Sequence, residues 1–302
     1  IKTRVLREIR WNSFPGSVIH GVLGMHLKNM SCVVPHRNCV KCYLKYSCPY
    51  GIIYESPVPP DSEKMKLYPQ IPHPIRIAAY PWRRPRLNTG EEFEVRLTLI
   101  GKSVSCLLMI LMALEKGFSE GLGRKHNGER GRAELLYVGD AVTGIETNWK
   151  ELGMNYSNVI SASNIEELAG MTDDTDITIS FLSPAKIVTR GKANFEPGLR
   201  DIMSPLLRRL GSLYYFHGDG EAEIDFSGVL DKANGIECDS EFKKVPAIRY
   251  SGRQSKTISI SGFTGEMRIE NCPGDIIRYL KMGQFIGLGK STTMGLGDYI
   301  LR

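Results

Sequence analysis

The sequence GLGKSTTMGLGDYILR, residues 287–302, contains the pattern that decides the fold. Two Gly-Leu-Gly triplets enclose Lys290 and a run of hydroxyl residues, and an apolar-alternating run follows to Leu301. Glycine adopts backbone conformations that other residues avoid and lets the chain approach a ligand closely. Because lysine and hydroxyl groups suit phosphate, the stretch predicts an anion-binding loop directly before a last strand. The loop residues that we expect to bind are Gly287, Gly289, Lys290, Ser291, Gly295 and Gly297.

The Gly-Lys-Ser sequence in this loop does not make a nucleotide-binding P-loop. A P-loop has a glycine five positions before the glycine that precedes its lysine. Gln284 occupies that position here. The pattern therefore disfavours a nucleotide triphosphatase, and the plain alternative for a single copy of such a loop is a glycine turn before a strand.

The loop pattern occurs twice in the chain. Residues 114–124, LEKGFSEGLGR, align with residues 280–290, LKMGQFIGLGK, and Gly117 pairs with Gly283. A helical apolar run precedes each copy and a strand-like run follows it, although the second triplet is degraded in the first copy. Such self-similarity predicts that each half of the chain is one copy of the same unit. A chance resemblance between glycine-rich segments is the alternative.

The periodicity of apolar residues gives both halves the order β-α-β-β-α-β. This order predicts an α+β protein with two tandem ferredoxin-like domains, over residues 1–140 and 173–302, joined by a linker region at 141–172. The first half is predicted to contain strands at 5–11, 75–82, 92–100 and 134–138 and helices at 15–30 and 103–116. The second half is predicted to contain strands at 176–182, 245–250, 256–261 and 298–301 and helices at 198–215 and 273–281.

An insertion at about residues 31–74 of the first domain is rich in cysteine and ends in a proline-rich loop. Its C-x6-C-x2-C-x5-C spacing includes the two-residue knuckle that brings two thiolates to one tetrahedral metal. The pattern favours a structural zinc, with an iron–sulfur cluster or free or paired thiols as alternatives. The expected ligands are Cys32, Cys39, Cys42 and Cys48.

The composition indicates a globular protein with a mild basic excess. The 302 residues carry a formal net charge of +6, which permits nucleic-acid binding without proving it. No apolar run approaches the roughly 18 residues of a membrane span, so we expect no membrane association. A cytoplasmic protein is the simplest expectation.

Several further segments resemble one known family. They are FPGSVIHGVLGMHL at 14–27, FLSPAKI at 181–187, PLLRRLGSLYYFHG at 205–218 and RYSGRQSKTISISGFTGEM at 249–267. Together with the glycine loop, they resemble the RAMP superfamily and within it the sixth CRISPR-associated protein family, the endoribonucleases that cut precursor CRISPR RNA. The cysteine insertion is similar to that of one branch of this family.

The resemblance implies metal-independent cleavage of repeat RNA. In such a reaction the ribose 2′-OH attacks the adjacent phosphorus, and the products carry a 2′,3′-cyclic phosphate and a 5′-OH. This chemistry needs a general base, a general acid and a cation near the phosphorane. Family members place a catalytic histidine or tyrosine on or just after the first helix, and some use no histidine. By resemblance, the candidates here are His20, His26 and His36, in that order. The alternatives are a packed helix side chain for His20 and a metal ligand or loop residue for His36.

Basic residues are the expected RNA contacts, although a charged run is more often a solvated face. Lys290 and Arg253 are the first candidates, followed by Lys256, Arg83, Arg84 and Arg124. The resemblance implies CRISPR repeat RNA as the partner and leaves open other Cas effector subunits and a homodimer. The alternative function is that of a non-catalytic RNA-binding RAMP subunit, in which the histidines have no role.

Overall fold

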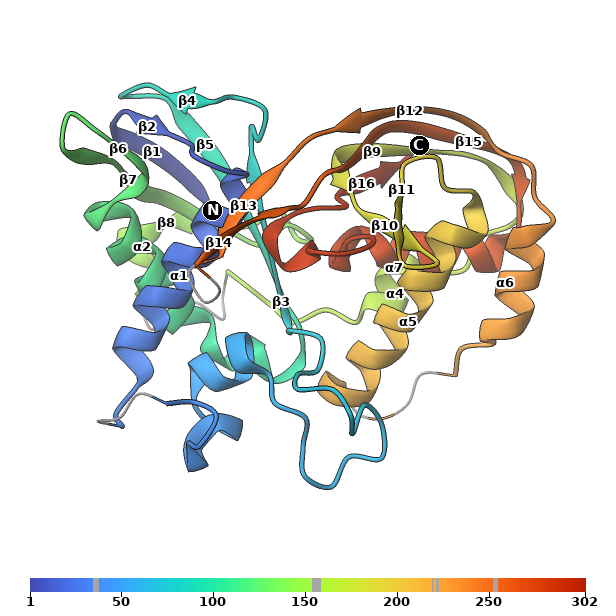
Figure 1. The fold of residues 1–302 in the computed structure, drawn as a ribbon, viewed down its shortest axis with the longest axis horizontal. Coiled ribbons are helices and arrows are strands. Elements are labelled where there is room, and N and C mark those ends of the chain that lie inside the picture. The colour runs from blue at the N-terminus through green and yellow to red at the C-terminus, as the bar shows by residue number, and fades with distance from the viewer. Residues whose placement is uncertain (35–37, 154–158, 219, 221–222, 252–254) are drawn as a thin grey trace. The chain divides into compact units, whose positions relative to one another are not determined.

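A computed structural model describes residues 1–34, 38–153, 159–218, 220, 223–251 and 255–302. The chain forms two compact units, residues 1–162 and 163–302, each with its own sheet and helices (Figure 1). None of the described helices combines the length and the hydropathy that a membrane crossing requires.

The first unit is built around a six-stranded antiparallel sheet in the order β3-β5-β1-β7-β6, with β8 paired to β7. Its central strands and two main helices follow the predicted β-α-β-β-α-β order, and the spatial order of those strands is that of a ferredoxin-like fold. The elements are β1 (Lys2–Arg7), β2 (Ile9–Arg10), α1 (Pro15–Ser31), η1 (Tyr43–Tyr46), η2 (Gly51–Glu55), β3 (Ile75–Tyr80), β4 (Arg86–Leu87), β5 (Glu92–Leu99), η3 (Gly101–Cys106), α2 (Leu107–Glu120), β6 (Leu122–His126), β7 (Glu129–Gly139), β8 (Glu146–Asn148) and α3 (Trp149–Leu152).

Helix α1 forms because Pro15 fixes the first helical φ angle and apolar residues follow at a spacing of four. Ile19, Leu23 and Leu27 are fully buried, and they pack in one cluster with residues of α2 and the sheet such as Ile110 and Val95. Val18 and Val22 on the same helix are only half-buried. The core of this unit therefore lies between α1, α2 and the sheet.

The second unit repeats the architecture with a four-stranded antiparallel sheet in the order β12-β15-β9-β16. Strand β15 pairs with β12 on one side and with β9 on the other, and the last strand pairs Tyr299 with Phe181. The elements are α4 (Ile165–Ala169), β9 (Thr175–Ala185), β10 (Ile187–Thr189), β11 (Lys192–Asn194), α5 (Leu199–His217), α6 (Phe226–Asn234), β12 (Asp239–Val245), β13 (Ile248–Ser251), β14 (Lys256–Ser259), β15 (Gly262–Cys272), α7 (Gly274–Ile286), η5 (Thr292–Met294) and β16 (Tyr299–Leu301).

The internal repeat is visible in the backbone. The amide of Gly121 donates to the carbonyl of Gly117 at the end of α2, and the amide of Gly287 donates to that of Gly283 at the end of α7, at 3.0 and 2.8 Å. Each Gly-Leu-Gly triplet thus begins at the residue that ends its helix. The copies then diverge, because the first continues directly into the hairpin β6–β7, whereas the second forms a longer loop before β16.

Two predicted strands of the second unit are wrong in position. Residues 245–250 and 256–261 were expected in the main sheet, but most of them form the separate hairpin β13–β14. The sheet strands are instead β12 and β15, which precede and follow that hairpin in the sequence and pair with each other in the sheet. The exposed, charged residues of β12 conceal the apolar alternation that identifies a half-buried strand.

The structure also divides the chain after residue 162, inside the region predicted as a linker. Strand β8 and helix α3 lie in that region and belong to the first unit, because Val138 and Tyr137 of β7 pair with Thr147 and Asn148 of β8. The helix predicted at 103–116 begins four positions later, after the six-residue 3-10 helix η3, and continues to Glu120.

Candidate functional site

The glycine loop of the second unit requires its glycines. Gly287, Gly289, Gly295 and Gly297 all have φ between 68° and 83°, the left-handed region that other residues avoid. A Cβ on Gly289 would lie 2.5 Å from the carbonyl oxygen of Lys186, and one on Gly297 would lie 1.8 Å from that of Leu288. The glycines are therefore explained by close approach of the loop to its own unit.

Main-chain hydrogen bonds fix this loop against the end of β9. The amide of Lys290 donates to Lys186 O, that of Gly297 donates to Pro184 O, and that of Leu288 donates to Gly297 O, each at 2.9 Å. These amides are already used within the protein, so they do not form an open backbone cradle for an anion. The side chain of Lys290 is exposed, and it is the group through which the loop can bind phosphate.

Lys290 lines an open pocket of about 470 Å³ in the second unit. The other walls come from the turn between β10 and β11 and from the first half of α5. Four cationic side chains line it, and they are Arg190, Arg200, Arg208 and Lys290. Among the residues that the structure describes, none of these four is recorded in an ion pair.

Asp201 is the acidic residue of this pocket, and its carboxylate is already satisfied. It accepts hydrogen bonds from Thr189 Oγ1 at 3.1 Å, from Asn194 Nδ2 at 3.2 Å and from the amide of Gly198 at 3.3 Å. These bonds fasten the β10–β11 hairpin to the start of α5. The carboxylate thus holds the pocket's framework together. Arg208 Nε donates to Ser204 O at 3.3 Å, a neutral partner, so the positive charge of the pocket remains available to an anion.

Lys186, whose carbonyl accepts from the amide of Lys290, adds a further positive charge. Burial, and then the charges of Lys290 and Arg249, lower the pKa of Lys186. The ammonium of Lys186 donates to Ser259 O at 2.8 Å, a neutral partner. Like charges gathered in this way attract anions and gain stability when an anion arrives.

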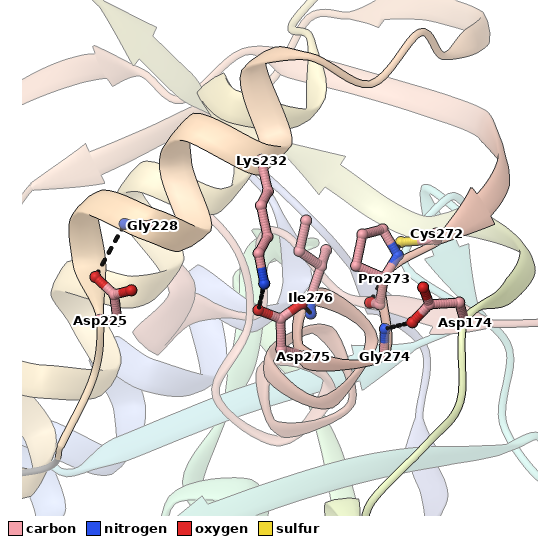
Figure 2. Close-up of polar contacts among 9 residues, drawn as sticks. All are labelled: Asp174, Asp225, Gly228, Lys232, Cys272, Pro273, Gly274, Asp275 and Ile276. Atoms are coloured by element: carbon pink, nitrogen blue, oxygen red, sulfur yellow. Dashed lines mark hydrogen bonds and ion pairs between the residues drawn. The ribbon is translucent and has the colours of Figure 1, made fainter.

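A second open pocket of the same unit, of about 710 Å³, has the opposite character. Figure 2 shows that two of its acids, Asp174 and Asp275, are engaged at the ends of helices. Asp174 accepts from the amide of Gly274 at 2.8 Å, and Asp275 pairs with the ammonium of Lys232 at 2.8 Å, which ties α6 to α7. We therefore interpret this pocket as structural.

His20 lies half-buried on α1 of the first unit, next to Tyr54 of the cysteine-rich insertion. The two ring centroids are 4.7 Å apart, and the Tyr54 hydroxyl donates to the carbonyl of His20 at 2.7 Å. Burial, and then the neighbouring Tyr50, raises the pKa of Tyr54 well above its usual value, so the phenol remains a donor. The insertion therefore packs on His20, the first of the three histidine candidates from the sequence.

His26 lies at the crossing of α1 and α2 and is only 3% exposed. Its Nε2 is 3.7 Å from Glu120 Oε2, and its ring packs against Gly117. Burial at a helix crossing is the environment of a packing residue, and it leaves little room for a substrate.

The cysteines of the insertion do not converge in the structure. Cys32, Cys39, Cys42 and Cys48 are all free thiols, and no group of three or more metal-ligating side chains forms among the described residues. Burial, above all, raises the pKa of Cys39. As placed, these residues do not fit a four-thiolate site, and the zinc stays a prediction.

Two family models match the chain. Residues 1–158 match a model described as an N-terminal domain, and residues 179–299 match the model of CRISPR-associated endoribonuclease Cas6. Residues 179–299 therefore form a Cas6-family domain. The Cas6 match spans β9 to β16, and so it contains the glycine loop and the basic pocket.

Solved Cas6 structures share the fold at low sequence identity. A Cas6 product complex is 17% identical with a TM-score of 0.57, covering 100% of this chain and 99% of that one. Thermus thermophilus Cas6 is 15% identical with a TM-score of 0.51, covering 100% and 98%. A partial Cas6-RT-Cas1–Cas2 complex is 12% identical with a TM-score of 0.55, covering 100% of this chain and 45% of that one. No curated protein sequence matches the chain.

The remaining residues expected to bind RNA are divided between the two units. Arg83, Arg84 and Arg124 are exposed in the first unit, where Arg84 pairs with Glu91 at 3.2 Å. Lys256 is exposed at the start of β14 in the second unit. The candidates His36 and Arg253 lie outside the described residues.

Sequence reasoning missed three arginines of the basic pocket and Tyr54. Arg200 and Arg208 are eight positions apart on α5, a spacing that places side chains on one face of a helix. Arg190 precedes glycine in a two-residue turn, which was a readable signal for a cation at a hairpin tip. The contact of Tyr54 with His20 joins residues 34 apart and had no local signal.

Proposed function

We propose that the chain binds precursor CRISPR RNA and cuts it within the repeat, without a catalytic metal. The observation that carries the proposal is the Cas6 match over the unit that contains Lys290 and its basic pocket. A nuclease that uses the ribose 2′-OH as its nucleophile needs positioned acid, base and cationic groups, which this chain can supply from its own side chains.

In the proposed reaction, the 2′-oxygen attacks the adjacent phosphorus and its proton passes to a general base. The P–O5′ bond then breaks, and the leaving 5′-oxygen receives a proton from a general acid. The products are a 2′,3′-cyclic phosphate and a 5′-OH. Histidine suits either proton transfer because its unperturbed pKa is about 6.5.

We assign the histidine role to His20. Its ring is half-buried, and the contact with Tyr54 fixes its orientation, which favours a catalytic side chain. We assign His26 a packing role at the α1–α2 crossing, because it is buried and paired with Glu120. His36 remains a candidate from the sequence.

The experiment incubates labelled cognate repeat RNA with the protein in excess EDTA and measures single-turnover cleavage. We expect His20→Ala to slow cleavage by about 100-fold or more, in line with loss of a general acid or base. His126→Ala, which changes an exposed histidine on β6, is the matched control and should cut at the wild-type rate. A wild-type rate for His20→Ala would reject the assignment.

End-group analysis of the product tests the chemistry. A 2′,3′-cyclic phosphate with a 5′-OH supports attack by the 2′-oxygen, whereas a 5′-phosphate would contradict it. Cleavage that disappears in EDTA would contradict metal independence. Tight binding of repeat RNA by a wild-type protein that does not cut would favour the non-catalytic RAMP subunit.

A further inference from the structure

We propose that the basic pocket between the β10–β11 turn, α5 and Lys290 is a separate binding site for the phosphodiester backbone of single-stranded RNA. This inference rests on the proposed function in that RNA is taken as the ligand. It adds a place on the second unit where the RNA is held independently of its base sequence and of the histidine on α1. The turn, α5 and the glycine loop all belong to this one unit (Figure 1).

The charge of the pocket is the first argument. Three guanidinium groups and one ammonium line it, whereas its carboxylate is occupied by Thr189, Asn194 and Gly198. Guanidinium groups bind phosphate oxygens in bidentate fashion, which makes clustered arginines a typical phosphate site. The acidic pocket of the same unit shows the contrast, because there Lys232 neutralises Asp275.

The backbone of Arg190 is the second argument. Arg190 and Gly191 form the two-residue connection between β10 and β11, and their φ angles are 50° and 79°. Such primed turns favour Asn-Gly, and the left-handed conformation is strained for arginine. Strained residues of this kind cluster at ligand sites, where the side chain has a use that compensates for the strain. Here the side chain of Arg190 contributes a cation to the lining of the pocket.

The lining residues indicate which part of the RNA is held. No aromatic side chain is among the described residues that line the pocket, so a base has no ring on which to stack. A volume of about 470 Å³ suits a small group such as a phosphate. Phosphate is the shared chemistry of an RNA chain and a free nucleotide. The cations come from three separate elements, which favours an RNA chain over a free nucleotide because an RNA chain presents successive phosphates.

The experiment measures binding of a labelled single-stranded oligouridylate by fluorescence anisotropy over a series of salt concentrations. Each lost phosphate contact should reduce the slope of log K against log salt by about 0.7 and weaken binding about fourfold near physiological salt. Arg190→Asn should therefore bind about fourfold more weakly while its melting temperature is unchanged or higher, because asparagine suits the turn. The double variant Arg200→Gln/Arg208→Gln should bind about 10- to 20-fold more weakly.

Lys232→Gln is the matched control, because it removes the same charge from the other open pocket of the unit. We expect it to retain the wild-type slope. The proposal would be overturned if Arg190→Asn and the double variant showed the same slope of log K against log salt as Lys232→Gln. Uridine monophosphate provides the second arm, and we expect it to displace the probe far less well than unlabelled oligouridylate at equal phosphate concentration. Equal displacement would overturn the assignment to an RNA chain.

The oligouridylate assay does not depend on cleavage. If the wild type fails to cut repeat RNA but the variants show the expected changes in salt slope, the proposed cleavage is rejected and the pocket is supported. If the wild type cuts repeat RNA but all variants show the same salt slope, the proposed pocket is rejected and the proposed cleavage is unaffected.

Discussion

At the scale of single residues, Gly24 controls how His20 is held. A Cβ at this position would lie 2.7 Å from Cε1 of Tyr54, the ring that packs on His20 and donates to its carbonyl. The same helix contains Gly21, where a Cβ would meet nothing within 4 Å. Two glycines three positions apart therefore have different reasons to be glycine.

We expect Gly24→Ala to lower the free energy of unfolding by about 1–3 kcal/mol, because the added methyl group displaces the tyrosine ring. Cleavage of repeat RNA should slow with it, because the ring fixes His20. Gly21→Ala should instead stabilise the protein by about 0.5–1 kcal/mol, as alanine does in an open helix position. Thermal unfolding and single-turnover cleavage measure both effects, and equal behaviour of the two variants would refute the distinction.

Sequence reasoning could name His20 but could not find its environment. The position followed from a local segment on the first helix, whereas Tyr54 comes from an insertion without helical or strand periodicity. The same limit applies to Asp201, whose hydrogen bonds to Thr189 and Asn194 depend on how the hairpin folds back on α5.

At the scale of elements, the repeat produces the same helix crossing in both units. A Cβ on Gly117 of α2 would lie 2.4 Å from Val22 of α1. A Cβ on Gly283 of α7 would lie 2.9 Å from Leu206 of α5 and, closer still, 2.1 Å from the Tyr299 hydroxyl of β16. The paired glycines of the repeat therefore mark the points where the two main helices of each unit touch. The alignment predicted the pairing, and the structure supplies its reason.

We expect Gly117→Ala and Gly283→Ala each to destabilise its own unit by about 1–3 kcal/mol through overpacking. Hydrogen exchange resolved along the sequence measures this. Protection should fall within residues 1–162 for the first variant and within 163–302 for the second. A uniform loss of protection in both units would contradict the assignment.

Acid stability is expected to depend on the turn that follows β7. The carboxylate of Asp140 accepts from the amides of Val142, Thr143 and Ser161 at 2.7, 3.1 and 3.1 Å. Burial opposes ionisation, but these hydrogen bonds outweigh it and hold the pKa of Asp140 below its usual value. A carboxyl with a lowered folded pKa contributes stability above its unfolded pKa of about 3.9 and loses it as pH falls through the folded value.

Asp140→Asn should therefore unfold more easily at neutral pH, by about 1–3 kcal/mol, and its stability should fall less on acidification than that of the wild type. Asp231→Asn, at an exposed position of α6, is the control. Denaturant titrations at several pH values below 5 measure the difference. Parallel stability curves for wild type and Asp140→Asn would contradict the expected linkage.

The order of elements was predictable because the main helices and most sheet strands carry a clear apolar period. The positions of strands β12 and β15 were not predictable, since β12 is exposed and charged and β15 contains glycine and polar residues. Residues 245–250 looked more strand-like than β12, although they lie mostly in a hairpin outside the main sheet. Pairing partners decide such cases, and partners distant in sequence leave no local trace.

At the scale of the whole molecule, the zinc prediction is the largest question left to chemistry. Only the C-x2-C part of the insertion has a standard spacing, and thiolates gather around an ion only when the ion is present. The sequence predicts about one zinc per chain, to be measured by elemental analysis of the purified protein. Cys42→Ser should lower the zinc content, and Cys238→Ser, outside the insertion, should not. Absence of metal from the wild type would leave the thiols free.

The hydrogen bonds that fix the glycine loop have a consequence for binding kinetics and entropy. Gly-rich loops usually exchange their amide protons quickly, but Leu288, Lys290 and Gly297 donate to buried or strand-end carbonyls. Their deuterium uptake should be as slow as that of the neighbouring sheet in the absence of RNA. A ligand that docks on Lys290 then meets a preordered backbone and loses little conformational entropy, so that association can be fast and governed by charge.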